Sequence, residues 1–325
     1  MRQRVVSGIQ PTGTMHLGNY MGTVGQWVSL QETHDVYGMI ADYHSLTTVY
    51  ADPKTLRVDK WNLAVDLLSA GIDPDKSCLF FQSDVAEHAE LYVLLSMITP
   101  LSWLERVPTY KSKLDNIEGK DLHTYGFLGY PVLQSADILL YQPDWVPIGK
   151  DQLPHLELAR EIARRFNALY GPLFKEPAEW LAQYPLLLGI DGRKMSKSYG
   201  NSIPVADSDD NTVALVKKMV TDPSRVKRTD KGHPQRCPVY GYHGIFNVDQ
   251  QEEIAQGCQS AQLGCVDCKS RCAQRIVDVL APFREKRRYW ENQPDTVKDI
   301  VAEGAKKARA VALHTLSCVK EIMKI

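Results

Sequence analysis

Two hydrophobic periods alternate through the first 200 residues of the chain. Short apolar runs typical of strands occupy residues 5–9, 36–40, 79–82 and 145–148. Apolar residues recur at helical spacing over residues 16–31, 52–68, 126–141 and 152–169, with Asp52 and Pro53 suited to start the second helix. Parallel strands need a long crossover connection, which is usually a helix. The alternation therefore predicts an α/β fold around a parallel sheet.

The pattern changes after Gly200, where only helical spacing remains. The helical runs are residues 211–220, 250–256, 273–283, 296–302 and 307–322, and we expect Pro223, Pro234, Pro282 and Pro294 to separate them. We therefore predict a parallel α/β domain over residues 1–200 and an all-helical domain over residues 201–325.

Charge divides unevenly between these two domains. Residues 1–200 carry 18 basic and 23 acidic side chains, whereas residues 201–325 carry 20 basic and 16 acidic ones. The net charge of -1 argues against a protein that coats nucleic acid with its whole surface, because such binding depends on a basic surplus. The helical domain has that surplus, which indicates either a local basic binding surface or a solvated helix face.

The composition, 44% hydrophobic and 24% charged, is that of an ordinary soluble globular chain. No apolar run approaches the ~18 residues of a membrane helix, and Met1 to Arg4 lead into a strand-like run rather than a signal peptide. We expect a cytoplasmic protein that has no membrane partner.

The most specific motif is Lys194-Met195-Ser196-Lys197-Ser198, which we call the signature loop. Two ammonium groups stabilise negative charge and two hydroxyls donate hydrogen bonds, so such a loop suits contact with phosphate. A basic surface loop without function is the simpler interpretation of these residue types alone. The full pentapeptide occurs by chance in a chain of this length in only about one case in ten thousand, and we interpret it as functional.

A second motif, His16-Leu17-Gly18-Asn19, follows the first strand and the turn Gln10-Pro11-Thr12-Gly13. It opens a helix, where backbone N–H groups and the helix dipole favour a phosphate group. His16 alone suits a capping role better than catalysis. Together with the signature loop, the motif favours the catalytic interpretation.

These two motifs resemble the signatures of class I aminoacyl-tRNA synthetases. Asn19 departs from the general class pattern, which has a second histidine at that position. Four further segments are similar to bacterial-type tryptophanyl-tRNA synthetases, and the resemblance runs from residue 7 to residue 316. These segments are residues 8–13, 42–47, 137–141 and 146–152.

The resemblance implies a Rossmann-like catalytic domain followed by a helical domain that binds the tRNA anticodon. It also implies activation of L-tryptophan with ATP to tryptophanyl-adenylate and pyrophosphate, transfer to tRNA(Trp), Mg²⁺ on the phosphates and a homodimer. The residues that it implies for catalysis are His16, Lys113, Lys194, Lys197 and Ser198. Those that it implies for ATP binding are Gln10, Pro11, Thr12, Gly18, Asn19, Gly149, Lys150, Asp151, Lys194, Met195, Ser196, Lys197 and Ser198. Lys150 departs from the family, which has an acidic residue there, so we expect a backbone contact.

Tyr130, Gln134 and Asp137 are spaced to share one face of a helix. The resemblance assigns this face to tryptophan, with Asp137 as the acceptor of the indole N–H. One carboxylate in an apolar pocket suits an indole, which offers one donor and a large π face. The same trio is compatible with tyrosine, so a tyrosyl-tRNA synthetase is one alternative and a non-catalytic, synthetase-like RNA-binding protein is another.

Five of the seven cysteines lie between residues 237 and 272. Cys237, Cys258, Cys265 and Cys268 supply four thiolates, enough for a [4Fe–4S] cluster or a zinc ion. Some tryptophanyl-tRNA synthetases carry a [4Fe–4S] cluster on a Cys-x22-Cys-x6-Cys-x2-Cys pattern, which this chain resembles with a first spacing two residues shorter. We expect that cluster, with zinc or free thiols as the alternatives, and Cys272 has no assigned role.

By the same resemblance, the cluster would shape the surface that binds the anticodon. Arg236, Tyr240, Tyr242 and His243 lie nearby in the sequence, and single-stranded bases are bound by stacking and edge hydrogen bonds. We expect these four side chains to contribute to that surface.

Overall fold

The computed structural model describes residues 2–108, 110, 121–181 and 187–325. The chain divides into two compact units. Unit 1 comprises Met1–Gly13, Thr23–Gln183 and Gln293–Ile325, and unit 2 comprises Thr14–Gly22 and Tyr184–Asn292. These units differ from the predicted domains 1–200 and 201–325 because the last 33 residues belong to unit 1 and the segment around His16 belongs to unit 2.

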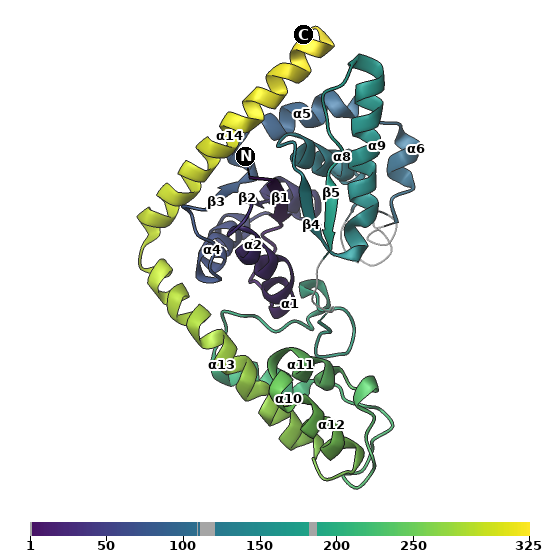
Figure 1. The fold of residues 1–325 in the computed structure, drawn as a ribbon, viewed down its shortest axis with the longest axis vertical. Coiled ribbons are helices and arrows are strands. Elements are labelled where there is room, and N and C mark those ends of the chain that lie inside the picture. Colours follow the sequence, from purple (N-terminus) through teal and green to yellow (C-terminus); the bar gives the residue numbers. More distant parts are fainter. Residues whose placement is uncertain (1, 109, 111–120, 182–186) are drawn as a thin grey trace. The chain divides into compact units, whose positions relative to one another are not determined.

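Unit 1 is built on a five-stranded parallel sheet in the order β3-β2-β1-β4-β5 (Figure 1). The strands are β1 (Arg4–Ile9), β2 (Asp35–Ile40), β3 (Ser77–Phe81), β4 (Trp145–Ile148) and β5 (Ala178–Leu181). The predicted α/β fold with a parallel sheet is confirmed, and β5 is a strand that the sequence analysis missed. The chain progresses outward from β1 in one direction and from β4 in the other, so β1 and β4 flank the point where the strand order reverses.

Helices pack around this sheet and bury a core with Val6, Phe80, Leu91, Val132 and Phe166. They are α2 (Gly25–Leu30), α3 (Asp42–Val49), α4 (Leu56–Ser69), α5 (Glu87–Ser96), α6 (Leu101–Glu105), α8 (Tyr125–Leu139), α9 (Leu153–Tyr170) and α14 (Pro294–Met323). Helices α3, α5 and α6 were not predicted. The predicted cap at Asp52 is wrong: α4 begins at Leu56, because Asp52 lies in the preceding turn, where its carboxylate accepts from Lys54.

Helix α14 is continuous, so the predicted separation into residues 296–302 and 307–322 is wrong. Its buried side chains, among them Val301, Ala308 and Leu316, follow one helical face along its whole length. Gly304 lies where α14 comes closest to β3, since a Cβ there would stand 2.0 Å from the carbonyl oxygen of Leu79. Burial of the continuous apolar face outweighs the low helix propensity of glycine.

Unit 2 holds α1 (Leu17–Asn19), which continues into a π-helical turn, Tyr20–Val24, that ends in unit 1; the described residues of unit 2 form four further α-helices. These are α10 (Asp209–Lys218), α11 (Pro238–Phe246), α12 (Gln251–Gln259) and α13 (Cys265–Glu291). Helix α11 was not predicted. The predicted break at Pro282 is wrong, because the buried face of α13 continues through Leu280 and Phe283, and its packing compensates for the hydrogen bond that proline removes.

Within the described ranges, no helix combines the length and the apolar character needed to cross a membrane.

Candidate active site

A cavity of about 190 Å³ opens in unit 1 beside the carboxyl ends of β1 and β4, where the strand order reverses. This is the usual place for a ligand in an open parallel sheet. Its walls combine apolar side chains with polar ones, and the polar ones include Gln134, Asp137 and His44. The lining residues are Val6, Ser7, Gly8, Gln10, Thr23, Met39, Ala41, His44, Gln134, Asp137, Ile138, Val146, Pro147, Ile148, Gly149 and Gln152.

Asp137 is 2% exposed and is held by three donors from separate parts of the chain. Gln82 Nε2 donates to both carboxylate oxygens, at 2.8 and 2.9 Å. His88 Nδ1 lies 2.7 Å from Oδ1, and His44 Nε2 lies 2.8 Å from Oδ2. Burial alone would raise the pKa of Asp137, but attraction to His88 and hydrogen bonds from both histidines outweigh it and lower the pKa to about 2. Asp137 is therefore a fixed, buried anion.

The three donors were not identified as site residues from the sequence. His44 follows β2 in α3, Gln82 follows β3, and His88 lies in α5. The His88 ring also meets the Tyr141 hydroxyl, with its Nε2 at 2.7 Å from that oxygen, so it cannot turn away from Asp137 without losing a second contact. A signal was present for His44, whose segment 42–47 carries part of the family resemblance, and none for the other two.

The other two members of the predicted tryptophan-binding trio lie differently. Gln134 lines the cavity with Asp137, as expected for one face of α8. Tyr130 is buried and does not line the cavity, and its hydroxyl lies 3.0 Å from His155 Nε2. Its ring also stands edge-on to that of His44, 6.5 Å between centroids, so Tyr130 supports a cavity residue.

Two groups of predicted ATP-binding residues also lie in unit 1. Gln10 and Gly149 line the cavity, whereas Thr12 and the side chains of Lys150 and Asp151 are exposed. Gly149 lies directly before the short helical turn Lys150–Gln152, and a Cβ there would stand 2.7 Å from Asp151 Oδ1. A side chain at position 149 would therefore displace the Asp151 carboxylate.

His16, Gly18 and Asn19 lie in unit 2 together with the signature loop. Backbone bonds join the first motif to the chain that follows the signature loop: Leu17 N donates to Ile203 O at 2.9 Å and Val205 N to Met15 O at 3.0 Å. Gly18 faces the loop, because a Cβ on it would lie 3.2 Å from the His16 ring and 3.7 Å from Met195 Sδ. The structure thus brings the two motifs that were predicted to contact phosphate together in one compact unit.

His16 caps α1, and its Nδ1 accepts from the backbone N–H of Asn19 at 3.2 Å. Burial and the positive charges of Lys197 and Lys194 lower the pKa of His16 from 6.5 to about 4. The ring is therefore neutral near pH 7, and because Nδ1 accepts, its proton lies on Nε2. This nitrogen can donate a hydrogen bond to an anion.

The signature loop follows a tight turn at Gly192, whose φ of 80° suits glycine. Gly189 N donates to Arg193 O at 2.7 Å, and Met195 N to Leu187 O at 3.3 Å. Met195 is buried, Lys194 is exposed and Lys197 is half-buried, so the methionine anchors the loop while the lysines reach the surface. The loop ends in the turn Lys197–Tyr199, capped by Gly200.

Lys113, predicted to reach the phosphates, lies outside the described residues.

The predicted cluster cysteines lie at adjoining element ends in unit 2. Cys237 precedes α11, Cys258 ends α12, and Cys265 and Cys268 begin α13. Burial, together with the charges of the other three thiols, raises the pKa of Cys268 to about 12. His243 Nε2 lies 3.3 Å from Cys268 Sγ, and Arg225 Nη1 lies 3.7 Å from Cys258 Sγ. The described part of the chain nevertheless has no group of three or more His, Cys, Asp or Glu side chains arranged to hold a metal ion.

Two of the four residues expected on a base-binding surface are buried, so that expectation is wrong for them. Tyr242 is 1% exposed and donates to Leu188 O at 2.6 Å. His243 is fully buried beside Cys268. Both face inward because α11 turns this side toward α13. Arg236 is exposed and Tyr240 is half-buried.

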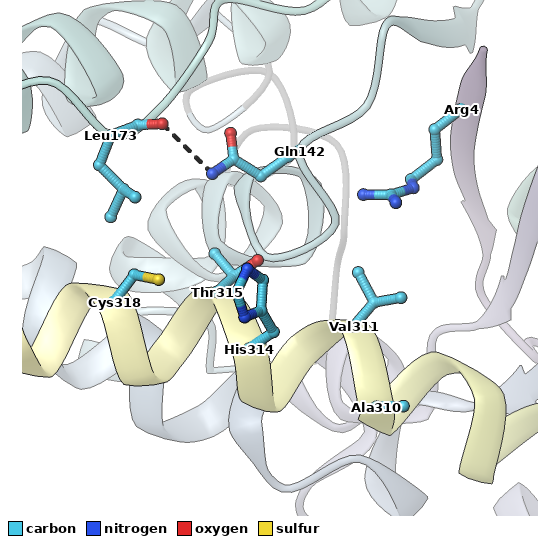
Figure 2. Close-up of a pocket in the computed structure, with 8 residues that line it drawn as sticks. All are labelled: Arg4, Gln142, Leu173, Ala310, Val311, His314, Thr315 and Cys318. Carbon is cyan, nitrogen blue, oxygen red and sulfur yellow. Dashed lines mark hydrogen bonds between the residues drawn. The ribbon is translucent and has the colours of Figure 1, made fainter. Parts of the chain in front are cut away.

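A second cavity in unit 1, of about 490 Å³, lies between α14 and the amino-terminal end of β1 (Figure 2). Ala310, Val311, His314, Thr315 and Cys318 of α14 form one wall, opposite Arg4, Gln142 and Leu173. Gln142 Nε2 donates to Leu173 O at 3.2 Å. None of the predicted site residues lines this cavity.

Comparison with known proteins gives the same family throughout. Residues 1–281 match the family of class I tRNA synthetases for W and Y. A tryptophan–tRNA ligase from Thermotoga maritima is 47% identical, with 99% of each chain covered. A second, from Aquifex aeolicus, is 39% identical and is matched over 99% of this chain and 100% of its own.

A crystal structure of tryptophanyl-tRNA synthetase from Campylobacter jejuni, complexed with ADP and tryptophan, covers 99% of this chain and 100% of its own, with a TM-score of 0.87 and 34% identity. The predicted resemblance to bacterial-type tryptophanyl-tRNA synthetases is confirmed. The chain belongs to the class I tRNA synthetases of the tryptophan and tyrosine family.

Proposed function

We infer that the chain is a tryptophan–tRNA ligase, which activates L-tryptophan with ATP and transfers it to tRNA(Trp). The buried, ionised Asp137, which lines the cavity beside β1 and β4, carries this inference. The relatives matched over its full length, at 39% and 47% identity, are tryptophan–tRNA ligases.

Asp137 suits an indole because it combines full ionisation with a fixed direction. An indole N–H can donate only to a group that is already an acceptor, and Gln82, His88 and His44 keep the carboxylate in that state. The apolar side chains of Met39, Val146 and other lining residues suit the π face. Gln134 offers a further polar contact at the cavity wall.

The residues of unit 2 suit the phosphates of ATP. In the proposed reaction a tryptophan carboxylate oxygen bonds to the α-phosphorus, the bond to the bridging oxygen breaks, and pyrophosphate leaves with the electron pair. Lys194 and Lys197 neutralise the developing charge, and the N–H at His16 Nε2 donates to a phosphate oxygen. Mg²⁺ enters on the phosphates as part of the substrate and neutralises their charge. No side-chain nucleophile is needed, so the protein contributes position and charge.

The proposal includes the predicted ATP-binding residues, which are Gln10, Pro11, Thr12, Gly18, Asn19, Gly149 to Asp151 and Lys194 to Ser198. Lys113 is included for the phosphates. We place the enzyme in the cytoplasm as a homodimer, and we assign tRNA binding to the helical region after residue 200, with the exposed Arg236 and half-buried Tyr240 as base contacts.

Amino-acid-dependent exchange between ATP and pyrophosphate tests the central proposal. We expect tryptophan to support exchange and tyrosine, at the same concentration, to give less than about one hundredth of that rate. Faster exchange with tyrosine would identify a tyrosyl-tRNA synthetase. No exchange with either amino acid would favour a non-catalytic RNA-binding protein.

We propose that Cys237, Cys258, Cys265 and Cys268 hold a [4Fe–4S] cluster, with zinc as the alternative. The support is the donor set, four thiols on adjoining element ends whose charges act on one another. When bound, the cluster would cross-link the starts of α11 and α13 to the end of α12, and it takes no part in adenylate formation.

Metal analysis and ultraviolet–visible spectra of anaerobically purified protein test this site. We expect the protein to contain iron and to absorb near ~400 nm. Zinc without iron would identify the site as a zinc site. Absence of both metals would show that the four cysteines are free thiols. Cys265→Ser should lower tRNA charging while pyrophosphate exchange stays near the wild-type rate. Loss of both activities would mean that the site holds unit 2 together.

A further inference from the structure

The signature loop is organised by one buried amide that the reaction itself does not use. Asn201 directly follows Gly200, which caps the last turn of the loop, and Asn201 is 1% exposed. Four hydrogen bonds converge on it. Its backbone oxygen accepts from Ile190 N at 2.9 Å, which ties the end of the loop to the strand-like segment that enters it.

Both ends of the side-chain amide are used. Asn201 Oδ1 accepts from the backbone N–H of Ser196 at 2.8 Å, in the middle of the loop. Nδ2 donates to the backbone oxygen of Lys194 at 3.1 Å and to Asp191 Oδ1 at 2.7 Å. One side chain thereby fixes the backbone on both sides of Met195, at Lys194 and at Ser196, the residue before Lys197. A carboxylate at position 201 would lack the donor, and an apolar residue would lack both groups.

Gly189 provides the space for this amide. A Cβ at position 189 would stand 2.3 Å from Asn201 Cγ, 2.4 Å from Nδ2 and 2.6 Å from its backbone oxygen. These distances are shorter than any van der Waals contact, so an alanine at position 189 would displace Asn201. The Asn201 side chain can therefore occupy its place only because residue 189 is a glycine.

We propose that Asn201 is a positioning residue for adenylate formation, which sets the signature lysines for the transition state without touching the substrates. This inference rests on the proposed function. Removing the amide should lower the rate of adenylate formation rather than the affinity for tryptophan, because the cavity that contains Asp137 is built entirely from residues of unit 1. A displacement of about 1 Å in a catalytic group can cost about a hundredfold in rate.

The first test is Asn201→Asp, which keeps the size and the acceptor and removes the donor. We expect kcat for tryptophan-dependent pyrophosphate exchange to fall about a hundredfold, with tryptophan affinity in equilibrium dialysis within about twofold of wild type. The double variant N201D/D191N exchanges the amide and the carboxylate, so the hydrogen bond between the two residues can form in the opposite direction. We expect the kcat of the double variant to be about tenfold higher than that of N201D.

Gly189→Ala tests the same contact without changing the amide. It should also lower kcat while leaving tryptophan affinity unchanged. Gly241→Ala is the matched control in unit 2, because a Cβ there meets nothing within 4 Å, and we expect wild-type exchange. Asn292→Asp is the matched amide control: Asn292 Nδ2 donates to Arg288 O at 2.8 Å on the exposed end of α13.

The proposal is overturned if folded N201D or G189A exchanges pyrophosphate at the wild-type rate. It is also overturned if tryptophan affinity falls as much as kcat, since Asn201 would then support the fold as a whole. If N201D does not fold, G189A decides between these results. Absence of tryptophan-dependent exchange in the wild-type enzyme would instead reject the proposed function, so the two failures are distinguishable.

Discussion

The two units present charge in opposite ways. In unit 1, Asp137 is buried and holds three protein donors around one carboxylate. In unit 2, Lys194 and Lys197 reach the surface, and a buried amide and backbone bonds fix only the chain from which they extend. The contrast matches the two ligands. A neutral N–H is selected by a buried acceptor that is held in one direction, whereas a phosphate group already attracts cations at an exposed surface.

We expect the largest loss of activity when a lysine of the signature loop is removed. Lys197→Ala should lower kcat for pyrophosphate exchange by about a hundred- to a thousandfold, because a charge that acts on the transition state is lost. Tryptophan affinity should stay within about twofold. Lys218→Ala, which removes an exposed lysine of α10 in the same unit, serves as the control. Equal losses of rate and tryptophan affinity would contradict a transition-state role.

Asp137→Asn tests the buried half of the comparison. The new amide would point an NH₂ group at donors from Gln82, His88 and His44, so we expect tryptophan to bind about a hundredfold more weakly. The KM for ATP should change little. Asp144→Asn is the control, since Asp144 is a partly exposed carboxylate of unit 1 paired with Lys175. An unchanged KM for tryptophan would remove Asp137 from the binding site.

Acid should act on unit 2 before it acts on the Asp137 site. The pKa of His16 is lowered from 6.5 to about 4, so its stabilising contribution is complete above pH 6.5 and is lost as the pH falls through 4. The pKa of Asp137 falls from 3.8 to about 2, so its contribution is lost only below pH 3.8.

Thermal unfolding measured between pH 7 and pH 4 checks this order. We expect the wild type to lose about 2 kcal/mol through His16, after allowance for its partial exposure. His16→Asn retains an N-cap acceptor without the titration, so its stability should depend less on pH. Identical pH dependence in the two proteins would contradict the lowered pKa of His16.

The smallest effect tests the support behind Asp137. Gln82→Leu removes two hydrogen bonds to the carboxylate and leaves those from the histidines, so the KM for tryptophan should rise about tenfold. Gln31→Leu is a matched control. Gln31 is also a buried glutamine of unit 1, and it bonds Gly71 O and Asp73 N instead. If both variants changed the KM equally, the effect would be one of general stability.

Most of the sheet could be predicted because each buried strand is a short apolar run that is visible in the local sequence. Strands β1 to β4 were identified from short apolar runs, and α2, α4, α8 and α9 from helical spacing, whereas α3, α5 and α6 were missed. The missed strand, β5, has alternating half-buried and exposed residues at a sheet edge, which gives little hydrophobic signal. The false breaks at Pro282 and between residues 302 and 307 arose where burial of a continuous face overrode local propensity.

Sequence by itself determined the family, the parallel sheet and the two phosphate motifs, because these depend on short segments whose residue types and spacing are fixed by chemistry. Tertiary structure decided what surrounds them. The donors to Asp137 lie 93, 55 and 49 residues away from it, and their convergence depends on how three crossovers pack. The same holds for Asn201, an ordinary loop residue in the sequence. Segments that are distant in the sequence decide which groups are buried and how they are hydrogen-bonded. They make Asp137 a fixed acceptor and allow Asn201 to hold the backbone of the signature loop.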